Sequence, residues 1–286
     1  MPLRSLSDVN AAHDDGRWHV QRVLKNAGVS HINWADATFA SGQPAYDARV
    51  GAAGRFTPCV AQGNDAVFFP PVPFGMERKL VAIDARVAQS AYRGPVSLYL
   101  FDLVGYYPMI DGDSTDEQLM DNTLPLPRYT GGEGVHAVIV NHIAPAQQSG
   151  VAVLNYTDSK GVDRTATIGV ANNGVGLVCS GVRPSASADT GPVSLSLASG
   201  TSGIRKINSI TYSTPPSGLH AIYLIKPFAT MTLGDNGIVG EKQFFIQNGT
   251  SMPLIPDGAW LSWFDRIAGS TATTTTFFGQ FTFAWG

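Results

Sequence analysis

The stretch VHAVIVNHI-APAQQSG-VAVLNYT-DSKG-VD-RTATIGV, from Val135 to Val170, decides the fold class of this chain. Residues 135–143 are mostly apolar on both parities, which predicts a strand that is covered on both of its faces. Residues 144–150 contain Pro, Ser and Gly and predict a loop, whereas residues 158–161 predict a tight polar turn. Residues 151–157 and 164–170 again have the composition of strands. Strand, loop, strand, turn and strand in succession predict an antiparallel meander.

Further strand-like runs occur on both sides of this stretch, with turn signals such as Pro215-Pro-Ser-Gly218 and Pro256-Asp-Gly258 between them. Helical crossover segments are missing between the runs, which argues against a parallel α/β sheet. The sequence therefore predicts an all-β fold, an antiparallel β-sandwich of jelly-roll type over residues 76–286. The additional predicted strands are residues 79–87, 96–103, 174–182, 192–199, 204–212, 219–228, 241–247, 259–267 and 277–285. The predicted core comprises Val138, Val140, Val153, Ile168, Ile222, Leu224 and Phe281.

The first 75 residues differ from the rest of the chain. Ser7-Asp8 predicts a capped short helix that runs through His13, and the rhythm of residues 17–26 predicts a second short helix. Residues 31–75 are rich in Gly, Ala and Pro with scattered aromatic side chains, and such segments seldom build a core of their own. We therefore expect residues 1–75 to form an N-terminal extended arm that carries short helices and lies over its own domain or a neighbouring subunit.

The composition narrows the class of protein. Only 14% of the 286 residues are charged, and 31 glycines and 18 prolines accompany a net charge of −3. A chain without a basic footprint is not expected to bind nucleic acid directly. No apolar run approaches the ~18 residues of a membrane helix, and the N-terminus lacks the apolar core of a signal peptide. Cys59 and Cys179 are isolated, which predicts free thiols in a soluble protein made in a reducing cytoplasm.

No motif in the sequence predicts a metal site, a cofactor site or catalytic residues. The acidic run from Asp111 to Asn122 lacks the Gly and the Glu of a calcium loop, and Ser114-x-x-Glu117 instead favours a capped helical turn. His136 and His142 share a parity, but six strand residues place them about 20 Å apart. The four glutamates could pair with aspartates in a glycosidase-like cleft, but any β protein has enough carboxylates for that, so they do not indicate an enzyme.

Aromatic side chains are the remaining candidates for a binding role. Tyr106, Tyr107, Trp260 and Trp263 could stack on sugars, although such residues more often fill a core or a subunit interface. At the C-terminus four large aromatics share one parity, which predicts a strand clamped in the core or in a neighbour's groove. The candidate interface residues are Trp18, Trp34, Phe68, Phe69, Phe283 and Trp285.

Three stretches of the chain resemble structural virion proteins of tailed bacteriophages: residues 106–118 (YYPMIDGDSTDEQ), residues 203–209 (GIRKINS) and the closing residues 283–286 (FAWG). The resemblance implies a non-enzymatic β-sandwich protein, most simply a capsid-associated decoration or minor capsid protein that stabilises the particle through subunit contacts. It also implies a homo-oligomer, with a major capsid or tail protein as partner, that is made in the host cytoplasm and located in the virion. The alternative is a tail or fibre component that binds a host surface glycan, and a carbohydrate-active jelly roll is a third hypothesis.

Overall fold

The computed structural model of the 286-residue chain describes residues 3–27, 34–37, 42–43, 51–61, 67, 70–88, 95–143, 149–171, 197, 199–234, 239–244, 252–267 and 275–286. These residues form one α-helix and fifteen strands, which hydrogen-bond in antiparallel pairs within three sheets. The all-β, antiparallel fold predicted from the sequence is therefore confirmed. Within the described residues, no helix is long and apolar enough to cross a membrane.

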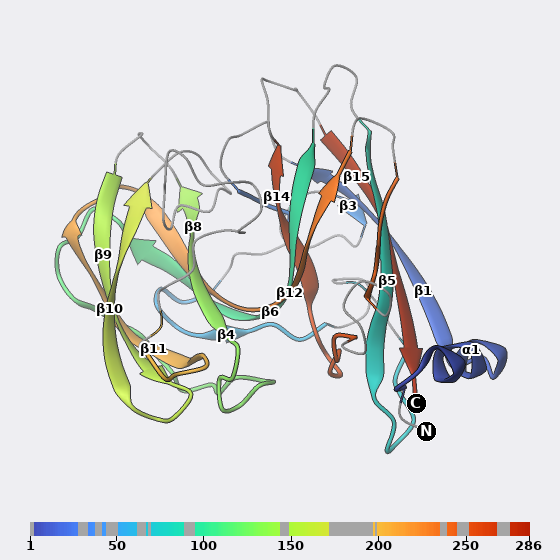
Figure 1. The fold of residues 1–286 in the computed structure, drawn as a ribbon. Coiled ribbons are helices and arrows are strands. Elements are labelled where there is room, and N and C mark those ends of the chain that lie inside the picture. Colours follow the sequence, from blue (N-terminus) through green and yellow to red (C-terminus); the bar gives the residue numbers. More distant parts are fainter. Residues whose placement is uncertain are drawn as a thin grey trace.

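Three sheets follow one another along the molecule (Figure 1). The five-stranded sheet, in the order β13-β5-β15-β1-β3, forms one end and the four-stranded sheet, in the order β10-β9-β11-β7, forms the other. The six-stranded sheet lies between them, in the order β2-β14-β6-β12-β8, with β4 also paired to β6. The strands of the five-stranded sheet are β1 (Trp18–Ala27), β3 (Gly42–Gln43), β5 (Arg78–Ala88), β13 (Gly240–Gln243) and β15 (Thr275–Trp285). Those of the six-stranded sheet are β2 (Ala35–Asp36), β4 (Thr57–Pro58), β6 (Val96–Asp111), β8 (His136–Ile143), β12 (Leu219–Leu233) and β14 (Leu261–Ile267). Those of the four-stranded sheet are β7 (Gln118–Leu119), β9 (Ser149–Asp158), β10 (Asp163–Ala171) and β11 (Ile204–Thr214).

Strands β6 and β12 are long enough to contribute to both ends of the molecule. Their pairing register shifts three times, near Tyr107, near Leu103 and near Phe228. Each shift adds a residue to one strand, and such bulges bend a strand pair. Pro227 is tolerated inside β12 because it lies beside one of these bulges. At Gly105, a side chain would overlap the ring of Phe56, so only glycine allows this close packing.

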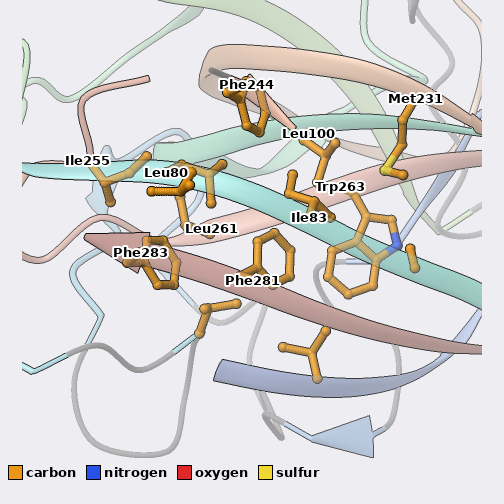
Figure 2. Packing of buried hydrophobic residues seen from close by; sticks show 14 of the residues in the cluster. Leu80, Ile83, Leu100, Met231, Phe244, Ile255, Leu261, Trp263, Phe281 and Phe283 are labelled. Carbon is orange, nitrogen blue, oxygen red and sulfur yellow. The ribbon is translucent and has the colours of Figure 1, made fainter. Parts of the chain in front are cut away.

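The first apolar core lies between the five-stranded sheet and one half of the six-stranded sheet. Figure 2 shows Ile83 of β5 and Phe281 of β15 facing Leu100 of β6 and Trp263 of β14. The rings of Trp263 and Phe277 lie 4.4 Å apart between centroids, which is a close aromatic contact. The inward aromatics of β15 therefore fill the chain's own core, as the parity of the C-terminal residues predicted.

The other half of the six-stranded sheet has apolar clusters on both of its faces. Ala137 and Ile139 of β8 pack with the four-stranded sheet, whereas Val138 and Val140 pack on the opposite face with Trp34 and its neighbours. This confirms that β8 is covered on both sides. The meander is wrong, however, because β8 pairs with β12 and only β9 and β10 form a hairpin with each other. Two successive strands that belong to different sheets have the same sequence pattern as a hairpin.

Six of the seven predicted core residues are buried, and Val153 is the exception. Ala152, Leu154 and Tyr156 are the inward residues of β9, so the residues between them lie on the outer face of the four-stranded sheet. Most predicted strands are present, and β6 and β12 extend well beyond their predicted ends. The strand predicted over 174–182 lies outside the described residues, as does nearly all of the strand predicted over 192–199.

The start of the chain differs from the prediction. Helix α1 (Leu6–Asp14) exists, but Ser5 caps it together with Asp8 in a capping box. The second helix, over residues 17–26, is wrong, because these residues form β1 and pair with β15 in ten register positions. Strand β1 lies between β15 and β3 within the five-stranded sheet. The division of the chain into an arm of residues 1–75 and a domain of residues 76–286 stays a prediction.

Candidate assembly surface

The aromatic residues proposed for sugar stacking are inside the protein. Tyr106 and Tyr107 are each 1% exposed, and Trp260 and Trp263 are also buried. Tyr107 uses its hydroxyl group internally, since the group donates to Asn122 Oδ1 at 2.7 Å and accepts from the backbone of Ile207 at 3.1 Å. These four side chains therefore offer no platform for a glycan and fill the core, which is the interpretation that the sequence favours.

The candidate interface residues fall into three groups. Trp34, Phe283 and Trp285 are buried within the chain, so a neighbouring subunit would reach them only if their segments left the sheets. Trp18 is half-buried at the start of β1, where its ring meets His13 edge-on at 5.5 Å. Phe68 and Phe69 lie outside the described residues. An interface role for these residues stays a prediction.

The acidic segment from Asp111 to Asn122 contains turns and the short strand β7 in place of the predicted helical turn. Asp111 Oδ1 accepts from the backbone of Asp113, and Ser114 Oγ accepts from the backbone of Asp116. These local bonds compete with a helix, because they satisfy the same backbone groups in a turn conformation. Within the described residues, no group of three or more His, Cys, Asp or Glu side chains could hold a metal ion.

A buried ion pair separates the two apolar cores on one face of β6. Asp102 lies between Leu100, in the core against the five-stranded sheet, and Val104, in the core against the four-stranded sheet. Arg128 Nε donates to Asp102 Oδ2 at 2.8 Å, and the same guanidinium donates to the carbonyl groups of Cys59, Leu103 and Gly258. All of these groups are internal, which identifies the pair as a structural element.

Two further buried ionisable groups have shifted pKa values. Burial, followed by the charge of Asp36, raises the pKa of Asp265 to about 7. Burial lowers the pKa of His220 to about 4, and its ring nitrogen Nδ1 lies 2.7 Å from the hydroxyl group of Tyr212. Shifted pKa values can mark a functional site, but these groups are enclosed by the fold and contact no surface.

Most of the outer face of the four-stranded sheet is polar and internally bonded, although Leu119 of the edge strand β7, paired with Ser209, is 75% exposed. Thr165 Oγ1 donates to Asn155 Oδ1 at 2.7 Å, and Asn155 Nδ2 donates to Ser209 Oγ at 2.9 Å. Ser209 Oγ in turn donates to Glu117 Oε1 at 2.6 Å. A ladder whose members satisfy one another has little to gain from a partner.

The outer face of the five-stranded sheet combines exposed apolar and charged side chains. Val20 and Leu24 of β1 are 39% and 36% exposed, and Val239, next to β13, is 58% exposed. Phe278 of β15 is half-buried beside them. Several large apolar groups on one sheet face are typical of a surface that another molecule covers. We refer to this face, made by the outward residues of β1, β15, β5 and β13, as the assembly surface.

The alternation of exposed and buried residues in β1 explains why the sequence pattern predicts a helix there. Val20, Arg22 and Leu24 point outward, whereas Val23 and Lys25 are buried between the sheets. A strand with apolar residues outside and a lysine inside does not show the usual binary pattern of a half-buried strand. The sequence therefore carried no signal from which this surface could have been found.

Charged residues form an ordered row across the assembly surface. The register pairs Arg22 of β1 with Gln280 of β15, Gln280 with Asp84 of β5, and Asp84 with Glu241 of β13. The row is thus basic at the β1 side and acidic at the β5 and β13 side. Burial, followed by the charge of Glu241, raises the pKa of Asp84. Like charges on opposite positions of paired strands destabilise a sheet, so a cation from outside would relieve this pair.

A neighbouring row is apolar in the middle and basic at one side. Leu24 pairs with Phe278, and Phe278 pairs with Arg86, whose guanidinium carbon lies 4.9 Å from the centre of the phenyl ring. The surface between these rows is hollowed into a shallow cavity of about 340 Å³. Arg22, Asp84, Arg86, Phe278 and Gln280 line it together with smaller groups. An apolar centre with charges around it is the usual arrangement of a protein–protein interface.

Comparisons with known proteins do not identify the role of the assembly surface. No family model matches the sequence, and no curated protein matches it. Among solved structures, the chain is weakly similar to the infectious bursal disease virus Gt strain, with 10% identity, a TM-score of 0.17, and coverage of 94% of this chain and 81% of that chain. A subviral particle of infectious bursal disease virus gives 9% identity, a TM-score of 0.19, and coverage of 93% and 80%. T=1 particles derived from infectious bursal virus give 10% identity, a TM-score of 0.17, and coverage of 93% and 77%. At TM-scores this low the similarity carries no argument about this protein.

Proposed function

We propose that this chain is a non-enzymatic structural protein of a bacteriophage virion, a capsid-associated decoration or minor capsid protein that stabilises the particle through subunit contacts. The observation that carries the proposal is the assembly surface, where exposed Val20, Leu24 and Val239 lie beside an ordered row of charges. Exposed apolar area on a rigid sheet costs free energy until another protein covers it. In an assembled particle, a neighbouring protein covers such a surface permanently.

The remainder of the chain supports this function. Low charge and antiparallel sheets with buried aromatics give a rigid body, and the three stretches that resemble tailed-phage virion proteins lie within or beside described strands. The expected partners are further copies of this chain and a major capsid or tail protein. We place the protein in the virion, after synthesis in the host cytoplasm, with residues 1–75 as an arm laid over its own domain or a neighbouring subunit.

The main argument for the alternative, a tail or fibre component that binds a host surface glycan, does not hold in the structure. It relied on surface aromatics, and Tyr106, Tyr107, Trp260 and Trp263 are buried. Phe278 is a half-buried ring, and Arg86 already covers one of its faces. Sugar rings stack on open aromatic faces, so this ring is a poor platform.

Quantitative mass spectrometry of purified particles tests the proposal. A capsid-associated protein should be present at a copy number of the same order as the shell protein, and labelled particles should show it over the head. A few copies at the tail would favour the fibre alternative. Absence of the protein from particles washed free of cell debris would overturn both.

A further inference from the structure

We propose that the assembly surface binds the same surface of a second copy of this chain, around a two-fold axis that runs along β15. This inference rests on the proposed function, because it names the partner that covers the surface. It uses the order of charges across β1, β15 and β5, which the strand register fixes.

Strand β15 is the middle of these three strands, with β1 on one side and β5 on the other. Adjacent strands lie about 4.8 Å apart, so Arg22 and Asp84 start from backbones roughly 10 Å apart, on either side of Gln280. Arg22 is exposed and has no ion-pair partner among the described residues. One subunit therefore presents a positive group and a negative group at equal distances from its central strand.

A two-fold axis along β15 exchanges the two sides of the sheet. Arg22 then lies over Asp84 of the partner subunit, and Arg22 of the partner subunit lies over Asp84. Gln280, on the axis, meets its own copy, and a side-chain amide can both donate to and accept from another amide. Both ion pairs form at once, as an isologous interface requires.

The apolar row obeys the same operation. Phe278 of β15 meets Phe278 of the partner subunit near the axis, and Arg86 is carried over Leu24 of the partner subunit. The arginine stem can cover the leucine side chain while its charged head stays in water. A two-fold axis perpendicular to the strands and through the row of Gln280 would instead place Arg22 over Arg22 and Asp84 over Asp84. Like charges in contact would oppose that arrangement.

The size of the surface predicts a modest affinity. Three strands of about ten residues make a face of roughly 14 Å by 34 Å, or about 500 Å² per subunit. A two-fold pair would bury about 1,000 Å², at the small end of specific interfaces. The isolated protein should therefore be monomeric when dilute and dimeric when concentrated. In a particle, neighbouring contacts would hold the two surfaces at a high effective concentration.

Charge exchange tests the axis directly. Sedimentation velocity of the purified full chain, from about 1 μM to about 100 μM, should show a monomer–dimer equilibrium for the native protein. Arg22→Asp alone, or Asp84→Arg alone, puts like charges together twice in every dimer, so each variant should remain monomeric. An equimolar mixture of the two variants should form heterodimers, because both contacts then pair opposite charges.

Two controls separate the interface from general effects. Thr167→Asp adds a charge to the exposed outer face of β10 and should leave the equilibrium unchanged. The melting temperature of Arg22→Asp should stay close to that of the native monomer, since Arg22 is exposed. A native protein that is monomeric throughout the concentration range would overturn the inference. So would single variants that dimerise as the native chain does, or a mixture that stays monomeric. The copy number of the protein in particles does not depend on whether these dimers form. The proposed function can therefore be supported or refuted independently of this inference.

Discussion

Arg128 is the residue on which the polar junction between the two cores depends. Its guanidinium forms an ion pair with the fully buried Asp102 and donates to three backbone carbonyl groups. Arg128→Ala would leave a buried carboxylate without its counter-charge, and such losses cost about 3–5 kcal/mol of unfolding free energy. Arg55→Ala is the matched control, because Arg55 pairs with Asp121 at 3.5 Å with both side chains about half exposed. We expect the control to cost at most about 1 kcal/mol. Urea unfolding of both variants measures the difference, and equal costs would contradict this role of Arg128.

Asp265 makes the stability of the fold depend on pH. The carboxyl group is fully buried, its Oδ1 atom has no hydrogen-bond partner among the described residues, and its pKa is raised to about 7 by burial and by Asp36. Asp36 in turn accepts from the hydroxyl group of Tyr223 at 2.8 Å and lies within the electrostatic range of Lys25. An unfolded aspartate has a pKa of about 3.9, so between about pH 4 and pH 7 the folded state keeps a proton that the unfolded state has lost. The unfolding free energy therefore falls across this window as the pH rises, by up to about 4 kcal/mol from this group.

Asp265→Asn removes this dependence, because the amide is neutral at every pH. Relative to the native protein, the variant should gain a few kcal/mol of stability between pH 4 and pH 8. The lowered pKa values of His136 and His220 are common to both proteins and cancel in the difference. Urea unfolding at several pH values measures it. Thr167→Ala, at an exposed position of β10 without a titratable group, should give a difference that is independent of pH. A flat difference for Asp265→Asn as well would show that Asp265 is ionised in the fold.

Two aromatic rings of β15, one from each face of the strand, can be compared directly. Phe281 is 1% exposed in the core against β6 and β14, whereas Phe278 is only half-buried on the assembly surface. Phe281→Ala should cost about 3–5 kcal/mol of unfolding free energy, the usual cost of truncating a buried phenylalanine. Phe278→Ala should change the monomer's stability much less and should weaken self-association. Thermal melting of dilute protein, followed by sedimentation at high concentration, separates the two effects. Equal losses of monomer stability would contradict the assignment of the two faces.

How far the elements could be predicted depends on how well each one follows a simple pattern. Strand β8 is apolar on both parities and was recognised as covered on both sides, because burial on two faces leaves no polar position. Strand β1 was read as a helix, since its buried Lys25 and its exposed Val20 and Leu24 reverse the pattern of a half-buried strand. Strand β12 continues to Leu233, beyond its predicted end at Phe228, because Pro227 lies beside a bulge and a sequence does not show where a bulge will tolerate a proline.

The assembly surface could not be predicted for a related reason. It consists of residues from four strands that are far apart in the sequence, such as Arg22, Asp84 and Gln280. Only the pairing register of the sheet brings them into one row, and register is not visible in a single sequence. The buried C-terminal aromatics were found from sequence because their parity within one strand is sufficient.

At the scale of the whole molecule, the two ends share strands and should not unfold separately. Strands β6 and β12 contribute to the core against the five-stranded sheet and to the core against the four-stranded sheet. An end that unfolded alone would have to release half of each long strand and expose the Asp102–Arg128 pair between the cores. The other end would lose the packing contacts that these strands provide, and it would be destabilised as well. The described part of the chain should therefore unfold as one cooperative unit.

The positions of the tryptophans allow a direct test of this coupling. All five tryptophans, namely Trp18, Trp34, Trp260, Trp263 and Trp285, lie outside the core against the four-stranded sheet. Ile210 is fully buried in that core, on β11, and Ile210→Ala should cost about 2–5 kcal/mol. If the two ends are coupled, the tryptophan fluorescence midpoint in urea will fall by the same amount as the midpoint of the far-UV circular dichroism signal. Thr167→Ala, exposed on β10, should move neither midpoint. A fluorescence midpoint that stays at its native value while the dichroism midpoint falls would mean that each end has its own stability.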